Sequence, residues 1–333
     1  MSSTKFKAAV VQAAPVFMNL DGCVDKAIDL IEKASREGAR IIAFPECWFP
    51  GYPWWIWLSI TAHNMKYFQQ YHENSLVLGG DAYTRLSQSA AENKIYVSAG
   101  VSERDYGSLY IAQLLFDDKG ELVQGRRKLK PTHMERTVFG EGNGSDIEVF
   151  ESDIGRLGQL SCWEHLQPLT KYAMYSMHEQ VHIAAWPSFS CYPRAYSLGP
   201  ELNCAVAQVY AVEGQCYVLS SCGVVSQEMV DLLVETEEQA ALLSVGGGFS
   251  QIYAPDGSPV CDPMPETEEG LLIAEIDLGA IAIAKSFADP VGHYSRPDVM
   301  RLLLNRSAQP KVEEFPSEGF EEVTAEQDVA NDD

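Results

Sequence analysis

Long hydrophobic runs are missing from this sequence of 333 residues, and its first five residues contain no apolar signal core. Basic residues are scarce as well: 24 Lys and Arg stand against 47 Asp and Glu, which gives a net charge of −23. Because nucleic acids and anionic membranes attract positively charged proteins, we expect no nucleic-acid partner and no membrane partner. These absences together predict a cytoplasmic protein.

Cysteine motifs that hold metals are also absent. The chain has eight cysteines, but no Cys-x-x-Cys pair occurs, so the spacing supports neither a zinc site nor any other metal site. In a long chain without a signal peptide, we expect these thiols to be reduced. The glycine-rich stretch at 140–145 lacks the Gly-Lys-Ser/Thr of a phosphate-binding loop, and we interpret it as a turn-rich loop.

A large core is well supplied, since 46% of the residues are hydrophobic. Residues 5–15, 21–38 and 39–44 have the patterns of a strand, an amphipathic helix and a second strand, which predicts a right-handed βαβ unit. Further hairpins and strands alternate with helical segments along the chain. The sequence therefore predicts an α/β protein with two sheets and helices outside them.

One stretch, residues 156–187, organises the candidate site. An apolar strand runs up to Cys162, the chain is then expected to turn sharply and enter a helix, and a buried strand follows at 181–187. Open α/β sheets bind ligands at the carboxyl ends of strands, and helix amides there lower a thiol pKa. A lone cysteine is more often a small buried hydrophobe, but Cys162 is followed by Trp163, Glu164 and His165.

Two other strand ends carry charged residues that could serve a thiol. Glu46 follows the strand at 39–44, and Lys128 lies in a basic stretch, 126–136, just after another strand. A single Glu or Lys is usually a surface ion. Residues 49–71 add a dense aromatic segment, which we interpret as a pocket wall or subunit contact rather than only a packed loop.

The three motifs together resemble the Glu–Lys–Cys triad of the nitrilase superfamily. They are Phe44-Pro45-Glu46, Arg127-Lys128-Leu129-Lys130-Pro131-Thr132 and Ser161-Cys162-Trp163-Glu164-His165. The Cys-Trp-Glu-His form resembles the nitrilase branch, and residues 128–145 and 170–187 look closest to bacterial aromatic and aliphatic nitrilases. The resemblance spans residues 5–306, so we expect a nitrilase domain at 1–306 and a disordered acidic tail at 307–333.

This resemblance implies an αββα four-layer sandwich, no cofactor, and homodimers that assemble into larger spirals. It makes Cys162 the nucleophile, Glu46 the general base, Lys128 the cation at the reacting centre, and Glu135 the family's second glutamate. The implied substrate is a small-molecule nitrile, which a thiolate attacks to form a thioimidate and then a thioester. A carboxylate base is needed because a free thiol is mostly protonated at neutral pH.

Candidate substrate-binding residues are Tyr52, Trp163, Trp186 and His133. Large aromatic residues line both cores and pockets, so Trp163 and Trp186 could be either. We expect His133 and His165 to be structural or supporting residues rather than catalytic ones, because the triad already has its base.

Other functions stay open at this point. An amidase, or a cyanide-converting enzyme that gives formamide or formate, would keep the same triad. A scaffold that only forms filaments would keep the fold, but the intact triad argues against it. A papain-like thiol hydrolase needs a Cys–His pair that no pattern supports. The aromatic segment favours a bulky organic nitrile over cyanide.

Assembly is predicted from the same resemblance. The helices expected at 166–179 and 200–213 would pack against their two-fold mates and bury apolar residues such as Tyr172 and Met174. Residues 54–71 and 226–243 would provide the surface through which dimers join.

Overall fold

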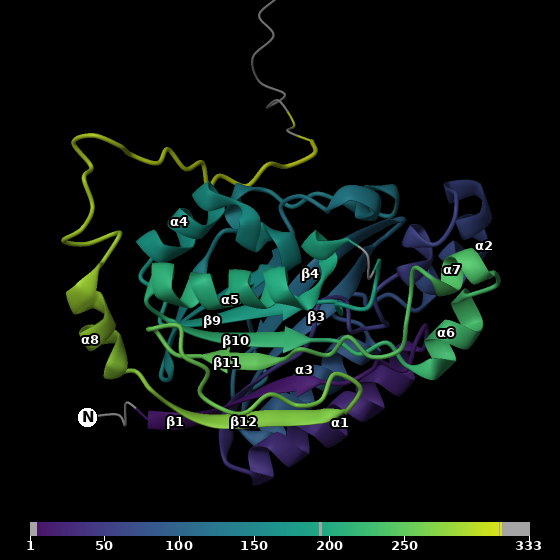
Figure 1. The fold of residues 1–333 in the computed structure, drawn as a ribbon, viewed down its shortest axis with the longest axis horizontal. Helices are drawn as coiled ribbons and strands as arrows, with labels where there is room; N and C mark the ends of the chain where they lie inside the picture. The colour runs from purple at the N-terminus through teal and green to yellow at the C-terminus, as the bar shows by residue number, and fades with distance from the viewer. Residues whose placement is uncertain (1–4, 193–194, 313, 315–333) are drawn as a thin grey trace, which may run out of the picture.

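Two β-sheets lie face to face in the computed structural model, which describes residues 5–192, 195–312 and 314 (Figure 1). The first sheet has the strand order β12-β1-β2-β3-β4-β5, with β6 paired to β4. The second has the order β11-β10-β9-β8-β7. The strands of the first sheet are β1 (Lys5–Gln12), β2 (Ala39–Ala43), β3 (Tyr96–Asp105), β4 (Ser108–Phe116), β5 (Leu122–Arg127), β6 (Phe139–Gly140) and β12 (Gly270–Asp277). Those of the second are β7 (Val149–Ser152), β8 (Gly155–Ser161), β9 (Val181–Trp186), β10 (Tyr217–Cys222) and β11 (Gln251–Tyr253).

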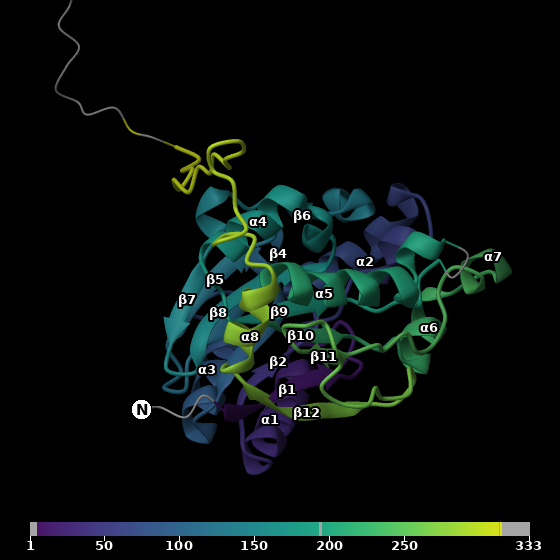
Figure 2. The ribbon, with the colours of Figure 1, turned by 60° about the vertical axis from the view of Figure 1, so that its left-hand side comes forward.

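Helices cover the outer face of each sheet. In Figures 1 and 2, α4 and α5 lie above the sheets and α1 lies below them. The helices are α1 (Leu20–Arg36), α2 (Thr61–Glu73), α3 (Asp81–Asn93), α4 (Pro168–Ser176), α5 (Pro200–Gly214), α6 (Gln227–Leu233), α7 (Glu237–Ala240) and α8 (Ala280–Phe287). The layers are therefore helix, sheet, sheet and helix, which confirms the αββα sandwich expected from the sequence.

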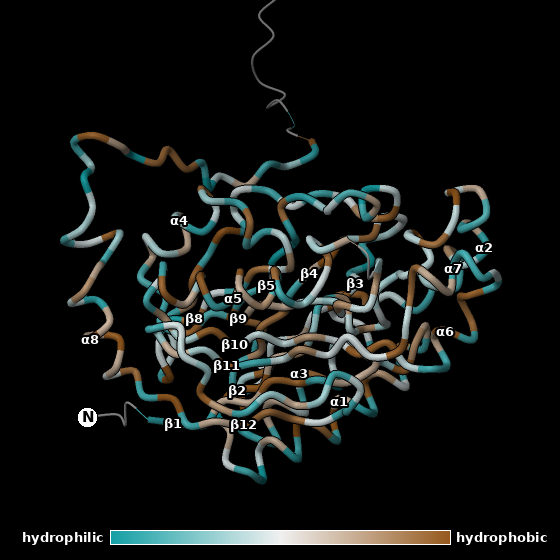
Figure 3. The backbone as a smooth tube through the Cα atoms, in the orientation of Figure 1, coloured by the Kyte–Doolittle hydropathy of each residue, from teal (hydrophilic) through white to brown (hydrophobic). Residues whose placement is uncertain are grey.

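Alternation along β1 shows how the sequence builds these layers. Successive side chains of a strand point to opposite faces. Ala9 and Val11 face the helical layer of α1 and α3, whereas Ala8 and Val10 pack between the two sheets. A third apolar layer lies between the second sheet and α4 and α5. Figure 3 shows hydrophobic colours along the inner strands and hydrophilic colours on much of the outer chain.

Parallel pairing sets the direction of the strands that end at the site. β1 and β2 pair in parallel around α1, as the βαβ pattern predicts. β8, β9 and β10 are also parallel neighbours, so their carboxyl ends lie at one edge of the second sheet. Open α/β structures bind ligands at such an edge.

The helix expected directly after Cys162 begins later. Cys162–Leu166 forms a 3₁₀ turn, and α4 starts at Pro168 and ends at Ser176. Cys162 has a φ of +48°, in the left-handed region that does not continue into a right-handed helix. The thiol therefore projects from a sharp turn, as predicted, and the α-helix begins six residues later.

The two segments expected to join dimers lie beside each other in the same chain. Residues 226–243 contain the short helices α6 and α7, next to α2 in Figure 1. His63 and Lys66 of α2 both bind the carboxylate of Glu235.

In the described part of the chain, no helix has the length and apolar character needed to span a bilayer. Most of the predicted acidic tail lies outside the described residues.

Candidate active site

Three strand ends bring Glu46, Lys128 and Cys162 together from different parts of the sequence. Glu46 follows β2, Lys128 follows β5, and Cys162 follows β8 of the facing sheet. The backbone N–H of Glu46 donates to the carbonyl of Trp186 at the end of β9, at 3.2 Å. A Cβ atom on Gly100 would lie 2.0 Å from the Pro45 carbonyl oxygen, so the close approach of β3 to the Glu46 turn requires glycine.

The Lys128 ammonium lies between two carboxylates. Its Nζ atom is 2.7 Å from Glu46 Oε1 and 2.9 Å from Glu135 Oε2, and these side chains have almost no solvent exposure. Burial alone would lower the pKa of Lys128, but Glu135 and Glu46, with Cys162, raise it well above its usual value. The cluster therefore keeps a positive charge next to the thiol.

The Glu46 carboxyl group is poised to carry a proton near neutral pH. Burial raises the pKa of Glu46 from 4.5 to about 8, although Lys128 acts to lower it and Glu135 adds to the rise. Its second oxygen, Oε2, is buried and has no hydrogen-bond partner within the described chain. A carboxylate that has a free oxygen and a pKa in this range is suited to accept a proton.

The pKa of the Cys162 thiol is raised, whereas a position at a helix N-terminus would lower it. Burial raises the pKa of Cys162 well above 9.0, and the negative charge of Glu46 raises it further. Lys128 and the backbone N–H of Trp163 act in the opposite direction. The expected lowering of the pKa by helix amides is wrong, because burial outweighs the donors at this turn. The thiol consequently needs a base to become nucleophilic.

Glu135 is held from two further directions. Its Oε1 atom accepts a hydrogen bond from the Tyr52 hydroxyl at 2.8 Å, and its Oε2 atom accepts from the Thr132 backbone N–H at 2.6 Å. Trp57 in turn donates from its Nε1 to the Tyr52 oxygen at 3.2 Å. Tyr52, predicted as a substrate-binding residue, thus both faces the site and fixes the carboxylate that holds Lys128.

A second buried ion pair joins the two loops that carry Lys128 and Cys162. Arg126 donates to both oxygens of Glu164, at 2.9 and 2.7 Å. The same carboxylate accepts from the backbone N–H groups of Leu129 and Ser161. No role was predicted for Glu164 or Arg126 from the sequence. Their signals were readable: the Ser161-x-x-Glu164 spacing of a capping box, and the period of two that places Arg126 and Lys128 on one face.

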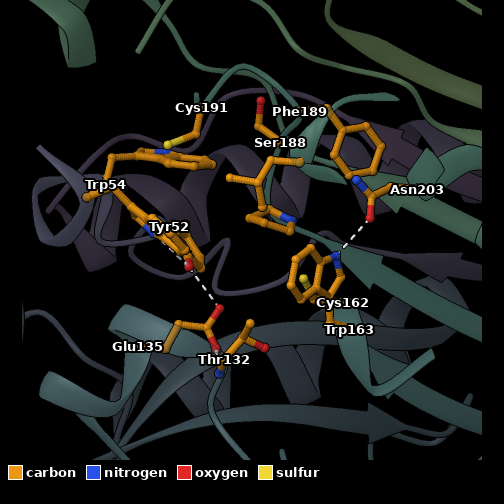
Figure 4. A pocket seen from close by; sticks show the side chains of 13 residues that line it. Tyr52, Trp54, Thr132, Glu135, Cys162, Trp163, Ser188, Phe189, Cys191 and Asn203 are labelled. Atoms are coloured by element: carbon orange, nitrogen blue, oxygen red, sulfur yellow. Dashed lines mark hydrogen bonds between the residues drawn. The ribbon is translucent and has the colours of Figure 1, made fainter. Parts of the chain in front are cut away.

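A narrow cavity of about 50 Å³ opens over the Cys162 thiol. Figure 4 shows aromatic rings around it, with Tyr52, Trp54 and Glu135 on one side and Trp163, Phe189 and Asn203 on the other. Trp163 donates from its Nε1 to Asn203 Oδ1 at 2.9 Å, which fixes its ring. The remaining lining residues are Trp57, Thr132, Pro187, Ser188, Cys191 and Leu198.

Two of the predicted substrate-binding residues do not line the cavity over Cys162. Trp186 is fully buried, stacks on His165 and packs against Phe189, so its side chain belongs to the core and does not line the cavity. His133 stacks on Trp57 and lines a neighbouring cavity of about 780 Å³. Trp163, like Trp57 and Leu198, borders both cavities, which therefore adjoin each other.

Two other thiols, those of Cys191 and Cys47, also lie near the site. All eight cysteines are free, and Cys191 shares the cavity with Cys162, while Cys47 is buried beside Glu46. Across the residues that the structure describes, no group of three or more His, Cys, Asp or Glu side chains is arranged to hold a metal ion.

The four layers, with a thiol, an ammonium and two carboxylates at one end of the sheets, define a sandwich of the nitrilase-superfamily class. A family model for carbon-nitrogen hydrolases matches residues 7–285, and the chain belongs to this family. It is 54% identical over 311 residues to a nitrilase of Pseudomonas syringae pv. syringae, which covers 93% of both chains. It is 50% identical to an arylacetone-specific nitrilase of Alcaligenes faecalis (90% of this chain, 84% of the relative). It is also 50% identical to an aliphatic nitrilase of Rhodococcus rhodochrous (90% and 83%).

Solved structures share the fold at low sequence identity. The C. elegans NitFhit protein superposes with a TM-score of 0.71 at 19% identity, covering 93% of this chain and 70% of that one. A carbon-nitrogen hydrolase from Helicobacter pylori G27 gives a TM-score of 0.70 at 16% identity, covering 90% and 97%. At this identity the likeness concerns the fold alone.

Proposed function

We propose that this chain is a nitrilase, which converts an organic nitrile and two water molecules into a carboxylic acid and ammonia. The observation that carries the proposal is the Lys128 ammonium held at 2.7 and 2.9 Å from two buried carboxylates, next to the thiol at the floor of the cavity. Relatives that are 50% identical or more and bear the name nitrilase support the same activity.

In the first step, Glu46 takes the proton of the Cys162 thiol, and the sulfur attacks the nitrile carbon. The new S–C bond forms as one π bond of the nitrile breaks, and its electron pair moves to nitrogen, which takes up a proton. The product is a thioimidate. Lys128 and the Trp163 backbone N–H are the donors that stabilise charge as it develops; one preorganised donor contributes about 3–4 kcal/mol.

In the second step, water adds to the thioimidate carbon and ammonia leaves, which gives a thioester. A second water then cleaves the S–C bond, releases the acid and restores the thiol. Glu46 is the group that removes a proton from each water, since its pKa of about 8 lies close to the working range. Glu135 holds the ammonium in place throughout.

The shape of the site favours nitriles with an apolar substituent. The cavity over Cys162 has room for little more than the nitrile group itself, whereas the adjoining cavity is apolar and large enough for an aryl or alkyl group. Cyanide would leave that space unused. Trp57, Trp163 and Leu198 border both cavities and would contact the substituent.

The test is ammonia release from a panel of benzonitrile, phenylacetonitrile, an aliphatic nitrile, cyanide and benzamide. We expect turnover of organic nitriles, complete loss in Cys162→Ala, and retained turnover in Cys191→Ala, the matched thiol in the same cavity. Turnover of benzamide or cyanide alone would favour the amidase or the cyanide-converting alternative. Loss in Cys191→Ala with activity in Cys162→Ala would contradict the assignment of the nucleophile.

We further propose that the outer face of α4 and α5 forms a homodimer interface, and that dimers assemble further into spirals. Leu169 is 69% exposed, and Val209 and Val212 are each 47% exposed on this face. Met174, predicted for the interface, is instead buried inside its own chain, and Tyr172 is partly buried. Light scattering of the wild type and of Leu169→Glu tests the interface, and a fully active monomer would contradict it.

A cytoplasmic location remains a prediction.

A further inference from the structure

Behind the Cys162 turn lies a continuous chain of buried polar side chains that the proposed mechanism does not use. His165 Nδ1 lies 2.6 Å from the carbonyl oxygen of Cys162, and His165 Nε2 lies 2.9 Å from His182 Nε2. His182 Nδ1 lies 2.9 Å from Glu179 Oε2, and the Tyr210 hydroxyl donates to Glu179 Oε1. The exposed fraction of His165 and His182 is 0%.

Hydrogen-bond chemistry fixes the direction of this chain. A carbonyl oxygen can only accept, so His165 must carry a proton on Nδ1. Burial lowers the pKa of His165 well below its usual value, and it is therefore neutral, with Nε2 as an acceptor. His182 must then donate from its Nε2, and its Nδ1 lies against Glu179 Oε2. Every ring nitrogen in the chain has a partner.

The surrounding residues are shaped to hold this chain. A Cβ atom on Gly158 would lie 2.1 Å from Glu179 Oε2, so β8 makes room for the carboxylate by having glycine opposite His182 in the parallel register. Trp186 stacks on His165, with ring centroids 5.1 Å apart, and Tyr210 stacks on His182 at 3.9 Å. Each histidine ring therefore has an aromatic ring stacked on it, which limits its rotation.

The carbonyl that His165 binds belongs to the Cys162–Trp163 peptide, whose N–H faces the Cys162 sulfur. A peptide unit is planar, so fixing the direction of its C=O also fixes the direction of its N–H. Cys162 has a φ of +48°, a conformation that surrounding contacts must maintain. We propose that the His165–His182–Glu179 chain is a positioning relay, which orients the Trp163 N–H toward the charge that develops on the reacting nitrile.

This inference rests on the proposed function and deepens it. The relay touches no reacting atom, so its members are positioning residues. Its effect falls on the transition state, because the oriented N–H stabilises negative charge that is absent in the free substrate. Loss of the relay therefore lowers kcat more than it raises KM.

The test compares nitrile hydrolysis with alkylation of Cys162 by iodoacetamide in the same variants. Alkylation forms an S–C bond as the C–I bond breaks, and it places no charge on a nitrile nitrogen. His165→Leu, which has no donor, should lose at least about 20-fold in kcat, a part of what removal of a preorganised donor costs. Its alkylation rate should fall by less than about fivefold, since the thiol and its base remain. His165→Asn, whose side-chain amide can donate to the Cys162 carbonyl, should recover kcat to within about fivefold of the wild type.

Ser98→Ala is the control for buried polar loss, because it removes a 2.6 Å hydrogen bond to Gln159 between the sheets, away from the cavity. It should lower the Tm and leave kcat unchanged. Full activity in His165→Leu would overturn the relay, as would equal losses in hydrolysis and alkylation. If His165→Leu does not fold, inactivity of a folded His165→Asn would overturn it. Lack of nitrile turnover in the wild type would overturn the proposed function itself, which the His165 variants alone cannot do.

Discussion

Two buried ion clusters lie next to each other in this protein, and they differ in how well their charges are matched. Arg126 and Glu164 form a neutral pair in which the carboxylate accepts four hydrogen bonds. Lys128, two residues further on, faces both Glu46 and Glu135, so that cluster has one positive and two negative groups. One oxygen of Glu46 has no partner in the described chain.

The pKa values follow this difference. Burial would raise the pKa of Glu164, but Arg126 and the backbone donors lower it below 4.5. Burial raises the pKa of Glu46 to about 8 despite Lys128, and the negative charge of Glu135 adds to the rise. A fully matched cluster supports the loops, whereas an incompletely matched one can accept and release protons near neutral pH.

Replacing Lys128 by Met should have the largest effect. We expect a loss of about 10³-fold or more in kcat/KM, since the substitution removes a donor to the developing charge and leaves two carboxylates facing each other. Lys128→Arg should not restore activity, because a planar guanidinium does not fit the place of a compact ammonium. Ammonia release measures both variants, and near-normal turnover in Lys128→Met would remove Lys128 from the mechanism.

Glu46→Gln should have the second-largest effect on kcat/KM, and it should also change how kcat/KM depends on pH. A general base contributes about 10²–10⁴-fold, so kcat/KM should fall within this range. In the wild type the base must be ionised; since its pKa is raised from 4.5 to about 8, kcat/KM should rise with pH through an acidic limb near 8. The Gln variant should lose this limb. A wild-type profile that is flat from pH 6 to 9 would contradict the role of Glu46.

Arg126→Met tests the matched cluster. It leaves the Glu164 carboxylate buried without its cation, so we expect the free energy of unfolding to fall by about 3 kcal/mol. Urea unfolding measures this change, and Lys130→Met is the control, because Lys130 and its partner Glu141 are more than half exposed. The control should lose at most about 1 kcal/mol. Equal losses in the two variants would show that the Arg126 pair is not important for stability.

Tyr52→Phe should have the smallest effect. It removes the 2.8 Å hydrogen bond to Glu135, while Lys128 and the Thr132 N–H still hold that carboxylate. One such bond contributes about 1–2 kcal/mol, so kcat/KM should fall by about fivefold to 30-fold. A steady-state assay with the preferred nitrile measures it. Complete inactivity would show that the Tyr52 hydroxyl acts on the substrate itself.

Much of the fold could be predicted because its signals are local. The helix at α1 has an apolar stripe with a period close to four, and β1 and β2 are short apolar runs on either side of it. α8 was not predicted, and the helix after Cys162 was placed too early. A turn with positive φ at a non-glycine residue leaves little trace in the sequence, because its cause is tertiary contact.

For the candidate site, the charged residues and the thiol could be predicted from the sequence, but the orientation of the aromatic rings could not. Motif order identified Glu46, Lys128, Glu135 and Cys162, which the structure brings together. The direction in which an aromatic ring points depends on packing between distant elements, so Trp186 could not be assigned to the core in advance. The sign of the thiol pKa shift was also missed, since it depends on how burial compares with nearby charges.

The most direct test of the chemistry is to locate the covalent intermediate. The wild type is mixed with its preferred nitrile, quenched in acid, digested and examined by mass spectrometry. We predict an acyl or imidoyl adduct on the peptide that contains Cys162, and no adduct after Cys162→Ala. An adduct on Cys191 or Cys47, or turnover without any adduct on Cys162, would contradict the assignment.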